Sequence, residues 1–471
     1  MYYRISDHIA LRSWKYVHRA YYAKNRPYAN GLTEEQFNLM LLCDGEHDIE
    51  PDELTKDLEE SGLIKRCNKG EHSSEWSTHK TYNNRYFPKM NFMITGKCNY
   101  NCLHCFNAAD NAPLMTEWSF DEVISLLDQA RDCGVNAFTI TGGEPMLHPR
   151  FMDILSEIHK RGMYVEELNT NGYFITQEIL DRMKDIDCIP YIKISFDGIG
   201  CHDWMRDKKG AEQKTLEAME LCVKNGFRVM SQTQVHRRNL HTLMDTARKL
   251  NEIGVSTLRL IRTTEVPRWE KNAPDSCLSF EEYFEKMLDF ISEYKNSRMY
   301  MNIIAWQLLE VYPISKSYNM VAVSSPTGDY SPTTPICRGN RGMIGVTSSG
   351  DIIPCLQMSG YFEEHNIHLG NLHNTPLSEL LSDGPYLKLV CANLHKLRKN
   401  NQKCDECRFF KYCNGGCPAL GRLYSPERDD LYGSDVTKCL FYEKGWYQKC
   451  SDALSGWRNN SAIEEFENNQ I

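Results

Sequence analysis

Short apolar runs alternate with longer polar stretches from residue 92 onward. The runs recur about every 25 to 40 residues, and the stretches between them have helical apolar spacing, which is typical of parallel β/α units. The predicted strands are Phe92–Ile94, Ala137–Thr141, Val165–Leu168, Ile192–Phe196, Val229–Gln234 and Leu258–Ile261. Capping boxes at Ser119 with Glu122 and at Ser279 with Glu282 mark two helix starts. Because a closed barrel of this kind has eight strands, six predict an α/β fold built on an open, partial (β/α)6 TIM barrel.

The chain before this pattern is predicted to form a small module of strands and helices. Thr33 and Gln36 fit a capping box, so a helix is expected to begin there. A second helical pattern runs from Leu54 to Leu63, and a Tyr-rich, strand-forming stretch precedes both helices. The polar residues from Asn68 to Asn84 predict a linker that leads into the barrel.

The length of 471 residues predicts two or three domains. We divide the chain into an N-terminal module (1–85), the barrel (86–310), a cysteine-rich domain (311–450) and a C-terminal tail (451–471). A net charge of -9 and the lack of long basic runs argue against a nucleic-acid partner. The sequence has no apolar signal region and no apolar run long enough to cross a bilayer, so we expect a cytoplasmic protein without membrane contact.

Nineteen cysteines in a reducing compartment are expected to be metal ligands or buried apolar residues rather than disulfides. Cys98, Cys102 and Cys105 follow the first predicted strand, where active-site loops leave a parallel barrel. This triplet has no fourth cysteine in step, so it can hold three irons of a cubane cluster and leave one iron open. The alternatives are buried thiols or a zinc site, for which only His104 is near.

A second cysteine group in the last third of the chain predicts further iron–sulfur clusters. Its members are Cys337, Cys355, Cys404, Cys407, Cys413, Cys417 and Cys439. A zinc ribbon over Cys404 to Cys417 is the alternative, because zinc sites also interleave in cysteine-rich modules. Seven further thiols are expected to be packing residues, namely Cys43, Cys67, Cys133, Cys188, Cys222, Cys277 and Cys450.

Gly142, Gly143 and Glu144 follow the second predicted strand, where the glycines let the backbone approach a ligand closely and Glu144 can bind an ammonium group. Taken with this motif, the cysteine triplet and the aromatic Phe106 resemble the radical S-adenosylmethionine (SAM) superfamily. The C-terminal cysteines resemble the SPASM extension of that superfamily. The resemblance covers residues 92–439 and implies an open iron that chelates SAM. It further implies that an electron cleaves SAM to methionine and a 5'-deoxyadenosyl radical, which abstracts a substrate hydrogen.

The resemblance also implies roles for single residues. Gly142, Gly143 and Glu144 would line the methionine amino group, Ser195 would contact SAM, Arg206 would meet its carboxylate, and Asn171 would touch the ribose or the substrate. Strand-end hydrogen bonding is the alternative for Ser195 and Asn171. For Arg206 the alternative is an exposed cation at a helix start.

In the SPASM region the resemblance implies two auxiliary clusters, so three 4Fe-4S clusters in all. One would be held by Cys404, Cys407, Cys413 and Cys439, and the other by Cys337, Cys355 and Cys417. Because no cysteine lies between Cys337 and Cys355, the second set is open or takes an outside ligand such as Cys391, an Asp or a substrate thiolate.

The N-terminal module resembles the winged-helix-like peptide-recognition module of ribosomal-peptide (RiPP) maturases. A leader peptide would then pair with an exposed strand edge of the module by β-augmentation. We therefore expect a peptide-modifying radical SAM enzyme that installs an intramolecular thioether or carbon–carbon cross-link in a precursor peptide. Its electrons would come from a donor such as flavodoxin or ferredoxin.

Three alternatives stay open: a sulfatase-maturing enzyme that forms formylglycine, a peptide epimerase, and a non-catalytic iron–sulfur redox adaptor. The extra N-terminal module counts against the first, and Glu144 together with the open cysteine triplet counts against the last. Asp197, Asp203, Glu265 and Tyr100 are candidate general bases, and their spacing does not rank them.

Overall fold

The computed structural model describes residues 1–105, 116–263, 267–324, 334–337, 342–425, 430 and 432–461. Phe106 and the candidate base Glu265 lie outside these described residues. The dominant feature is one mixed sheet of 12 strands in the order β17-β16-β7-β8-β9-β10-β11-β12-β13-β14-β15-β18. Among the described residues, the two end strands of this order do not pair with each other, so the sheet is open, as predicted.

The six predicted strands are confirmed and pair in parallel, each with the next. They are β7 (Lys89–Thr95), β8 (Ala137–Gly142), β9 (Tyr164–Thr170), β10 (Tyr191–Ser195), β11 (Val229–Val235) and β12 (Thr257–Arg262). Alternate side chains face opposite sides, so Ile192 and Ile194 of β10 are fully buried, whereas Lys193 and Ser195 on the other face are half-buried.

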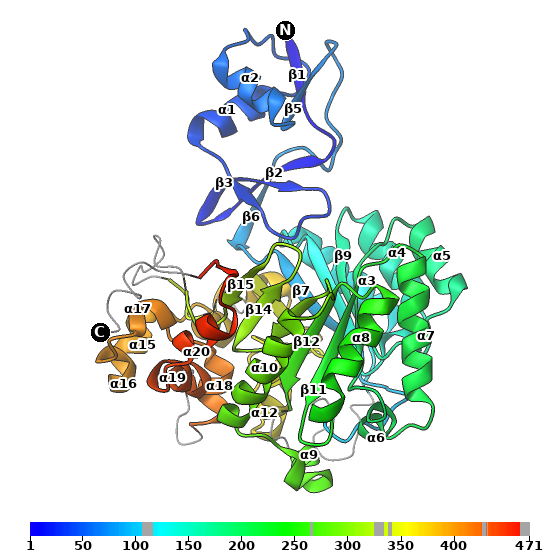
Figure 1. The fold of residues 1–471 in the computed structure, drawn as a ribbon. Coiled ribbons are helices and arrows are strands. Elements are labelled where there is room, and N and C mark those ends of the chain that lie inside the picture. The colour runs from blue at the N-terminus through cyan, green and yellow to red at the C-terminus, as the bar shows by residue number, and fades with distance from the viewer. Residues whose placement is uncertain are drawn as a thin grey trace.

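Helices cover the apolar face of these strands (Figure 1). The longer ones are α3 (Phe120–Asp132), α4 (Phe151–Lys160), α5 (Gln177–Asp185), α7 (Ala211–Lys224), α8 (Leu243–Ile253) and α10 (Phe280–Lys295). The predicted capping boxes at Ser119 and Ser279 are both present and start α3 and α10. The short helices α6 (His202–Arg206) and α9 (Pro267–Asn272) lie at the opposite end of the sheet from the N-terminus in Figure 1.

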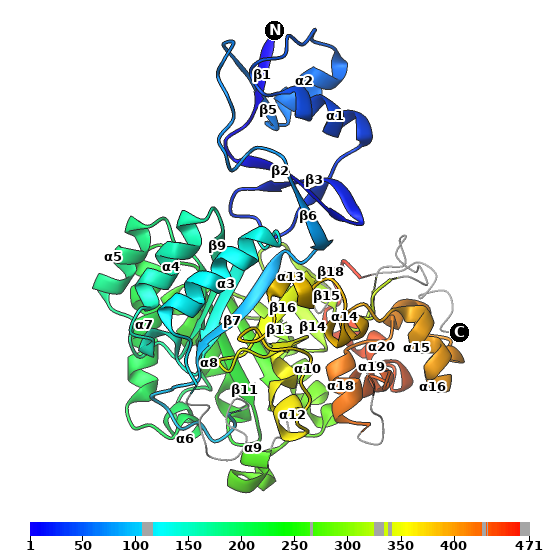
Figure 2. The same ribbon diagram turned by 180° about the vertical axis from the view of Figure 1, so that it is seen from behind.

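The sheet extends beyond the six predicted strands on both sides. On one side, β13 (Asn302–Ala305) continues the parallel order, and β14 (Leu309–Tyr312), β15 (Ser317–Met320) and β18 (Arg458–Asn459) follow it. On the other side, β16 (Met343–Val346) pairs in parallel with β7 and carries β17 (Ile352–Ile353), as Figure 2 shows from behind. Part of the predicted tail, through β18, is therefore built into the sheet.

The N-terminal module has an apolar core of its own, separate from the core of the large sheet. Its strands are β1 (Tyr2–Ile5), β2 (Ile9–Lys15), β3 (Val17–Ala23), β4 (Asn30–Gly31), β5 (Ile64–Cys67) and β6 (Lys80–Arg85), and its helices are α1 (Glu34–Leu42) and α2 (Glu53–Glu60). The predicted capping box at Thr33 starts α1. The predicted linker is wrong at its end, because β6 pairs in parallel with β2 and Tyr82 packs on Trp14.

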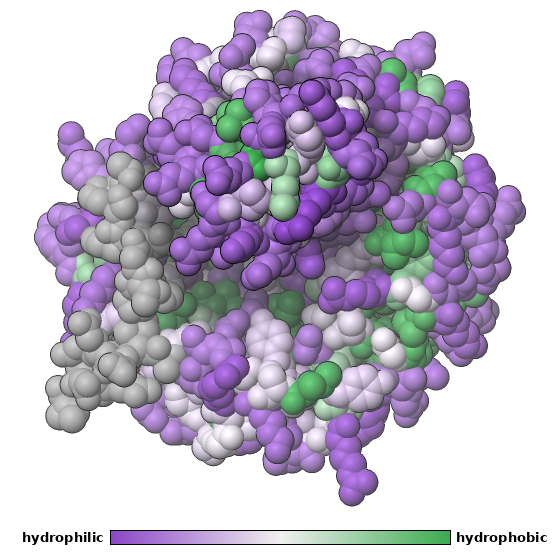
Figure 3. Space-filling view, turned by 90° about the horizontal axis from the view of Figure 1, so that it is seen from above, coloured by the Kyte–Doolittle hydropathy of each residue, from purple (hydrophilic) through white to green (hydrophobic). Residues whose placement is uncertain are grey.

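This module sits at the amino ends of the barrel strands (Figure 1). The Tyr22 hydroxyl donates to the Gly134 carbonyl at 2.9 Å, and the Trp76 indole donates to the Gly162 carbonyl at 3.0 Å. Both glycines lie just before a barrel strand, β8 and β9 respectively. Seen from this end, the surface is mostly hydrophilic, with apolar side chains in separate patches (Figure 3).

The described C-terminal region holds short helices. They are α12 (Ser359–Glu364), α13 (Leu377–Leu380), α14 (Pro385–Val390), α15 (Leu394–Asn400), α16 (Gln402–Asp405), α17 (Phe410–Cys413), α18 (Pro418–Leu423), α19 (Val436–Glu443) and α20 (Trp446–Ala453). Helices α19 and α20 pack on α10, whereas α13 packs on α3 (Figures 1 and 2). Among the described residues, no helix combines the length and the apolar content that a membrane crossing needs.

Candidate active site and cysteine-rich region

The first cysteine triplet lies in the loop that leaves the carboxyl end of β7. Cys98, Cys102 and Cys105 pack together with Tyr100 and Ala211. The Tyr100 backbone N–H donates to Cys98 Sγ at 3.5 Å. Burial raises the pKa of Cys98 to about 12, and the charges of Cys102, Glu144 and Cys105 act in the same direction. Thiolates crowded in this way disfavour one another's ionisation, so iron cations are the kind of ligand that would offset the cost.

Arg206 at the end of α6 contacts this triplet. Its Nη1 donates to Cys102 Sγ at 3.6 Å, and its Nε lies 2.7 Å from Asp197 Oδ2. Burial raises the pKa of Asp197, but Arg206 and His202 outweigh that effect and hold the pKa below its usual value. Arg206 is 7 % exposed, so the alternative prediction of an exposed cation is wrong. Its predicted contact with the SAM carboxylate stays a prediction.

The two glycines after β8 allow close packing against the backbone that follows β7. A Cβ on Gly142 would lie 2.3 Å from the Thr95 carbonyl oxygen, and one on Gly143 would lie 2.3 Å from the Lys97 carbonyl oxygen. Any side chain at either position would push these two segments apart. The glycines therefore fix the end of β8, and Glu144 with it, against the cysteine loop.

Glu144 is fully buried at the carboxyl end of β8. Its carboxylate accepts hydrogen bonds from Thr170 Oγ1 at 2.8 Å and from the Asn171 backbone N–H at 2.8 Å. Burial raises the pKa of Glu144 to about 7. No lysine, arginine or histidine of the described chain forms an ion pair with it. Since a buried carboxylate without a cation is costly, the arrangement fits a ligand that brings an amino group.

Asn171 and Ser195 end the next two strands. The Asn171 side-chain amide donates to Asn99 Oδ1 at 2.8 Å and lies 3.9 Å from Cys98 Sγ. Ser195 is half-buried and stands opposite Gln232 on β11. The fold thus places Glu144, Asn171 and Ser195, three of the predicted SAM contacts, at the carboxyl ends of adjacent strands. The hydrogen bond from Thr170 to Glu144 was not predicted, because a threonine at a strand end carries no sequence signal for such a contact.

Two of the candidate general bases are engaged in structural contacts. Asp197 pairs with Arg206, as described above. Asp203 accepts hydrogen bonds from the backbone N–H groups of Gly210 and Glu212 at 2.6 and 2.7 Å, which fixes the start of α7. Neither carboxylate is therefore free to take a substrate proton without losing a contact of the fold.

The C-terminal cysteines fall into two electrostatic groups. Burial raises the pKa of Cys413 to about 12, and the charges of Asp435, Cys439 and Cys404 raise it further, against Lys438. Burial likewise raises the pKa of Cys417 to about 12, and Asp435, Cys355 and Cys337 contribute in the same direction. The two groups contain the predicted cluster ligands of this region except Cys407, and the role of all of them as cluster ligands stays a prediction. Among the described residues, no group of three or more His, Cys, Asp or Glu side chains is placed to share a single metal ion.

Asp435 links the two cysteine groups and was not predicted. It is 2 % exposed, and its carboxylate accepts hydrogen bonds from the Cys417 backbone N–H at 2.7 Å and from the Thr437 backbone N–H at 2.9 Å. The second bond caps α19, the helix that carries Cys439. One buried carboxylate thus positions a cysteine of each predicted set.

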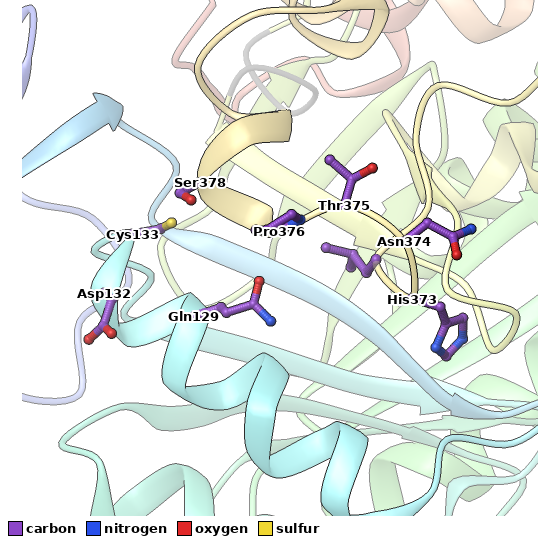
Figure 4. A pocket seen from close by; sticks show the side chains of 9 residues that line it. Gln129, Asp132, Cys133, His373, Asn374, Thr375, Pro376 and Ser378 are labelled. Atoms are coloured by element: carbon purple, nitrogen blue, oxygen red, sulfur yellow. The ribbon is translucent and has the colours of Figure 1, made fainter.

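A cavity of about 510 Å³ lies between α3 and the segment that leads into α13 (Figure 4). Gln129, Asp132 and Cys133 line it from one side, and His373, Asn374 and Thr375 line it from the other. Cys133 is 2 % exposed, as expected for a packing residue. The cavity forms the junction of the barrel and the C-terminal region.

An open parallel β/α sheet with a cysteine loop at its carboxyl edge, followed by a helical region rich in cysteines, defines an iron–sulfur enzyme built on a partial barrel. Residues 92–250 match the family model of the radical SAM superfamily, and residues 337–408 match that of the SPASM iron–sulfur cluster-binding domain. The chain therefore contains a radical SAM domain followed by a SPASM domain. The first domain binds a 4Fe-4S cluster and SAM, and the second binds auxiliary iron–sulfur clusters.

Known proteins resemble this chain over most of its length. It is 26 % identical over 351 residues to the AdoMet-dependent heme synthase of Methanosarcina barkeri, covering 74 % of this chain and 95 % of that protein. It is 25 % identical over 338 residues to the subtilosin biosynthesis protein AlbA of Bacillus subtilis, covering 70 % and 67 %. The crystal structure of Streptococcus suis SuiB bound to its precursor peptide SuiA has a TM-score of 0.65 at 16 % identity, covering 93 % of this chain and 99 % of that one. This last likeness shows the fold.

Proposed function

We propose that this enzyme modifies a ribosomally made precursor peptide and installs an intramolecular thioether or carbon–carbon cross-link. Two of the similar proteins support a peptide substrate: SuiB was solved with a precursor peptide, and AlbA is named for the biosynthesis of a bacteriocin. The heme synthases support a competing substrate, a tetrapyrrole. The choice between them rests on the N-terminal module.

The module is the observation that carries the proposal. Because the SuiB alignment covers 93 % of this chain, it must extend into residues 1–85. Within the module, the backbones of Tyr3 and Ile5 on β1 bond away from β5, to Gly45 and Cys43. Their partners on β5, Arg66 and Ile64, therefore direct their own N–H and C=O groups to the outer edge. An outer edge of this kind is what an extended leader peptide needs for β-augmentation.

Glu144 and its neighbours are proposed to hold SAM. Glu144 would accept a hydrogen bond from the amino group, while Thr170 and the Asn171 backbone keep the carboxylate in place. Asn171 and Ser195 would border the rest of the ligand on the two following strands. Arg206 would lie on the side of the site where Cys102 is, because its guanidinium contacts the Cys102 thiol.

Cys98, Cys102 and Cys105 are proposed to hold the cluster that meets SAM, and the two C-terminal groups to hold the auxiliary clusters. When bound and reduced, the cluster and SAM supply a 5'-deoxyadenosyl radical that removes one substrate hydrogen. Bond formation would release the second hydrogen as a proton and leave one electron, which an auxiliary cluster would accept. Flavodoxin or ferredoxin is the proposed donor of the electron that cleaves SAM.

The test is the mass of a short peptide encoded beside this gene after anaerobic incubation in heavy water with the reconstituted enzyme, SAM and a strong reductant. The full precursor should lose two hydrogens, whereas the same peptide without its leader should react far more slowly, because it cannot use the module. Deuterium gain from heavy water without other change would mean an epimerase. Equal reaction of both peptides would remove the module from substrate recognition.

A further inference from the structure

The face of the central sheet that points away from the helices, its inner face, carries a row of residues that begins at Ser195 of the proposed SAM site and runs away from that site. Ser195, Gln232, Arg259, Ile304 and Glu310 stand opposite one another on five neighbouring strands, from β10 to β14. Adjacent strands lie about 4.8 Å apart, so the Arg259 backbone stands roughly 10 Å from that of Ser195. The charge of Cys355, a predicted auxiliary-cluster ligand, also acts on Arg259.

A cavity of about 250 Å³ opens at Arg259. Its walls are Lys193, Met230, Arg259, Ile304, Trp306, Gln307, Glu310 and Val321. Sites for drug-sized ligands measure about 300–1,000 Å³, so this one fits a side chain rather than several residues. Gln307, in the turn between β13 and β14, has a φ of 64°, a left-handed conformation that few non-glycine residues adopt. Such backbone strain persists where the surrounding structure holds a residue in place.

The two cations of the cavity differ in their pairing. Lys193 Nζ lies 2.7 Å from Glu167 Oε2, so its charge is balanced by the fold. Arg259 Nη1 donates to the neutral Gln232 Oε1 at 3.2 Å. Among the described residues, no carboxylate forms an ion pair with Arg259, although the charges of Glu167 and Glu310 act on it. Burial lowers the pKa of Arg259. A buried guanidinium in this state keeps donors for a planar anion, and carboxylates match its geometry.

Glu310 supplies the opposite charge to the cavity. It accepts hydrogen bonds from the Tyr312 hydroxyl at 2.7 Å and from the Asn319 amide at 3.2 Å, and both reach Oε2. Within the described chain, Oε1 has no hydrogen-bond partner and can accept an N–H. The cavity therefore offers guanidinium donors and a carboxylate acceptor, both on one face of the sheet.

We propose that this cavity binds one acidic residue of the peptide substrate, with its carboxylate on Arg259 and a peptide N–H on Glu310. The proposal rests on the proposed function, because it requires a peptide on the inner face of the sheet. A side-chain carboxylate and a C-terminal carboxylate present the same chemistry. Anchoring this residue fixes which neighbouring residue of the peptide stands beside Ser195, so the cavity selects the position that reacts.

The test compares Arg259→Gln with Arg248→Gln, a control on the surface of α8 whose side chain is 54 % exposed. The probe is the precursor peptide encoded beside the gene, with each Asp or Glu changed in turn to Asn or Gln, and with its C-terminus amidated. Calorimetry on the cluster-reconstituted full chain measures the Kd of each pair, and iron content checks that each variant folds. Arg259→Lys, which keeps the charge but loses the planar donor pair, is the second variant.

Arg259→Gln should weaken binding of the native peptide about thirtyfold or more, the scale for a buried charge pair that loses one partner. Arg259→Lys should recover part of this loss, and Arg248→Gln should bind as the wild type does. One of the peptide substitutions should weaken binding to the wild-type enzyme by a similar factor but should not weaken binding to Arg259→Gln any further. The substituted residue is then the one whose carboxylate binds Arg259.

Two negative results are distinguishable. If the wild type modifies the peptide and Arg259→Gln binds every peptide as the Arg248→Gln control does, the anionic pocket is wrong and the proposed function stands. If the wild type neither binds nor modifies any form of the peptide, the proposed function fails and this inference falls with it.

Discussion

Replacing Glu144 with Gln should weaken SAM binding, and the loss should grow with pH. The carboxylate is fully buried, and Thr170 and the Asn171 backbone orient it, so the substitution changes charge more than shape. Truncating one partner of a buried charge pair costs about 2–5 kcal/mol, which is about 30-fold to 5,000-fold in Kd. That range applies where Glu144 is ionised in the wild type.

The pH dependence follows from the pKa of about 7, which burial gives this carboxyl. Binding an amino group needs the ionised form, which makes up about a tenth of the enzyme at pH 6 and about nine tenths at pH 8. The Kd of Glu144→Gln divided by that of the wild type should therefore rise about tenfold between pH 6 and pH 8. Because the ligand's own amino group titrates equally in both measurements, the ratio isolates Glu144.

Calorimetry of S-adenosylhomocysteine binding to the cluster-reconstituted enzymes measures both quantities. Glu117→Gln is the matched control, since Glu117 lies near the same loop but already pairs with Lys97 at 2.9 Å. The control should bind within about threefold of the wild type, as expected for a partly exposed pair. A ratio that does not change with pH, or a Glu144→Gln enzyme as tight as the control, would refute this account of Glu144.

Four further outcomes are expected. Changing all three cysteines of the first triplet to Ala should abolish SAM cleavage, whereas Cys404→Ala should keep part of it, because Cys404 belongs to an auxiliary set. The amount of 5'-deoxyadenosine formed measures SAM cleavage in both variants. Deleting residues 1–80 should leave SAM cleavage intact but prevent modification of a leader-bearing peptide, as its mass will show. Arg206→Gln should lower the midpoint potential of the first cluster by on the order of 100 mV, because the contact of Arg206 with Cys102 Sγ at 3.6 Å is lost. Arg206→Lys should restore part of this potential. A potentiometric titration followed by electron paramagnetic resonance measures both. The module lies at the amino ends of strands such as β7, which has 7 residues. A spacer of fewer than about seven residues between the leader and the reacting residue therefore cannot span the sheet. A peptide with a shorter spacer that still reacts would contradict this placement.

The barrel strands were predictable because each is an apolar run that a helix separates from the next strand. The strands that sequence reasoning missed, such as β14 and β18, have only four and two residues and no helical interval to set them apart. β6 was missed for a different reason: its residues are mostly polar, and Tyr82 alone marks the face that packs on Trp14.

The cysteines and Glu144 were found because chemistry ties them to fixed spacings. Arg259 was not, since a single arginine between Leu258 and Leu260 does not show which face of the sheet it occupies. The pairing of Arg206 with Asp197 was also hidden, because it depends on the path of the chain around Gly198 and α6 rather than on any spacing. Contacts made by tertiary packing leave no periodic trace in a sequence.

The central claim, that this radical SAM enzyme cross-links a precursor peptide, is tested most directly by one mass measurement. The peptide encoded beside the gene is incubated in heavy water with the reconstituted enzyme, SAM and a strong reductant under anaerobic conditions. The account predicts an intact mass lower by two hydrogens, with no deuterium gained at the cross-linked carbon. An unchanged peptide alongside released 5'-deoxyadenosine would contradict it, because the enzyme would then be active on a substrate of another kind.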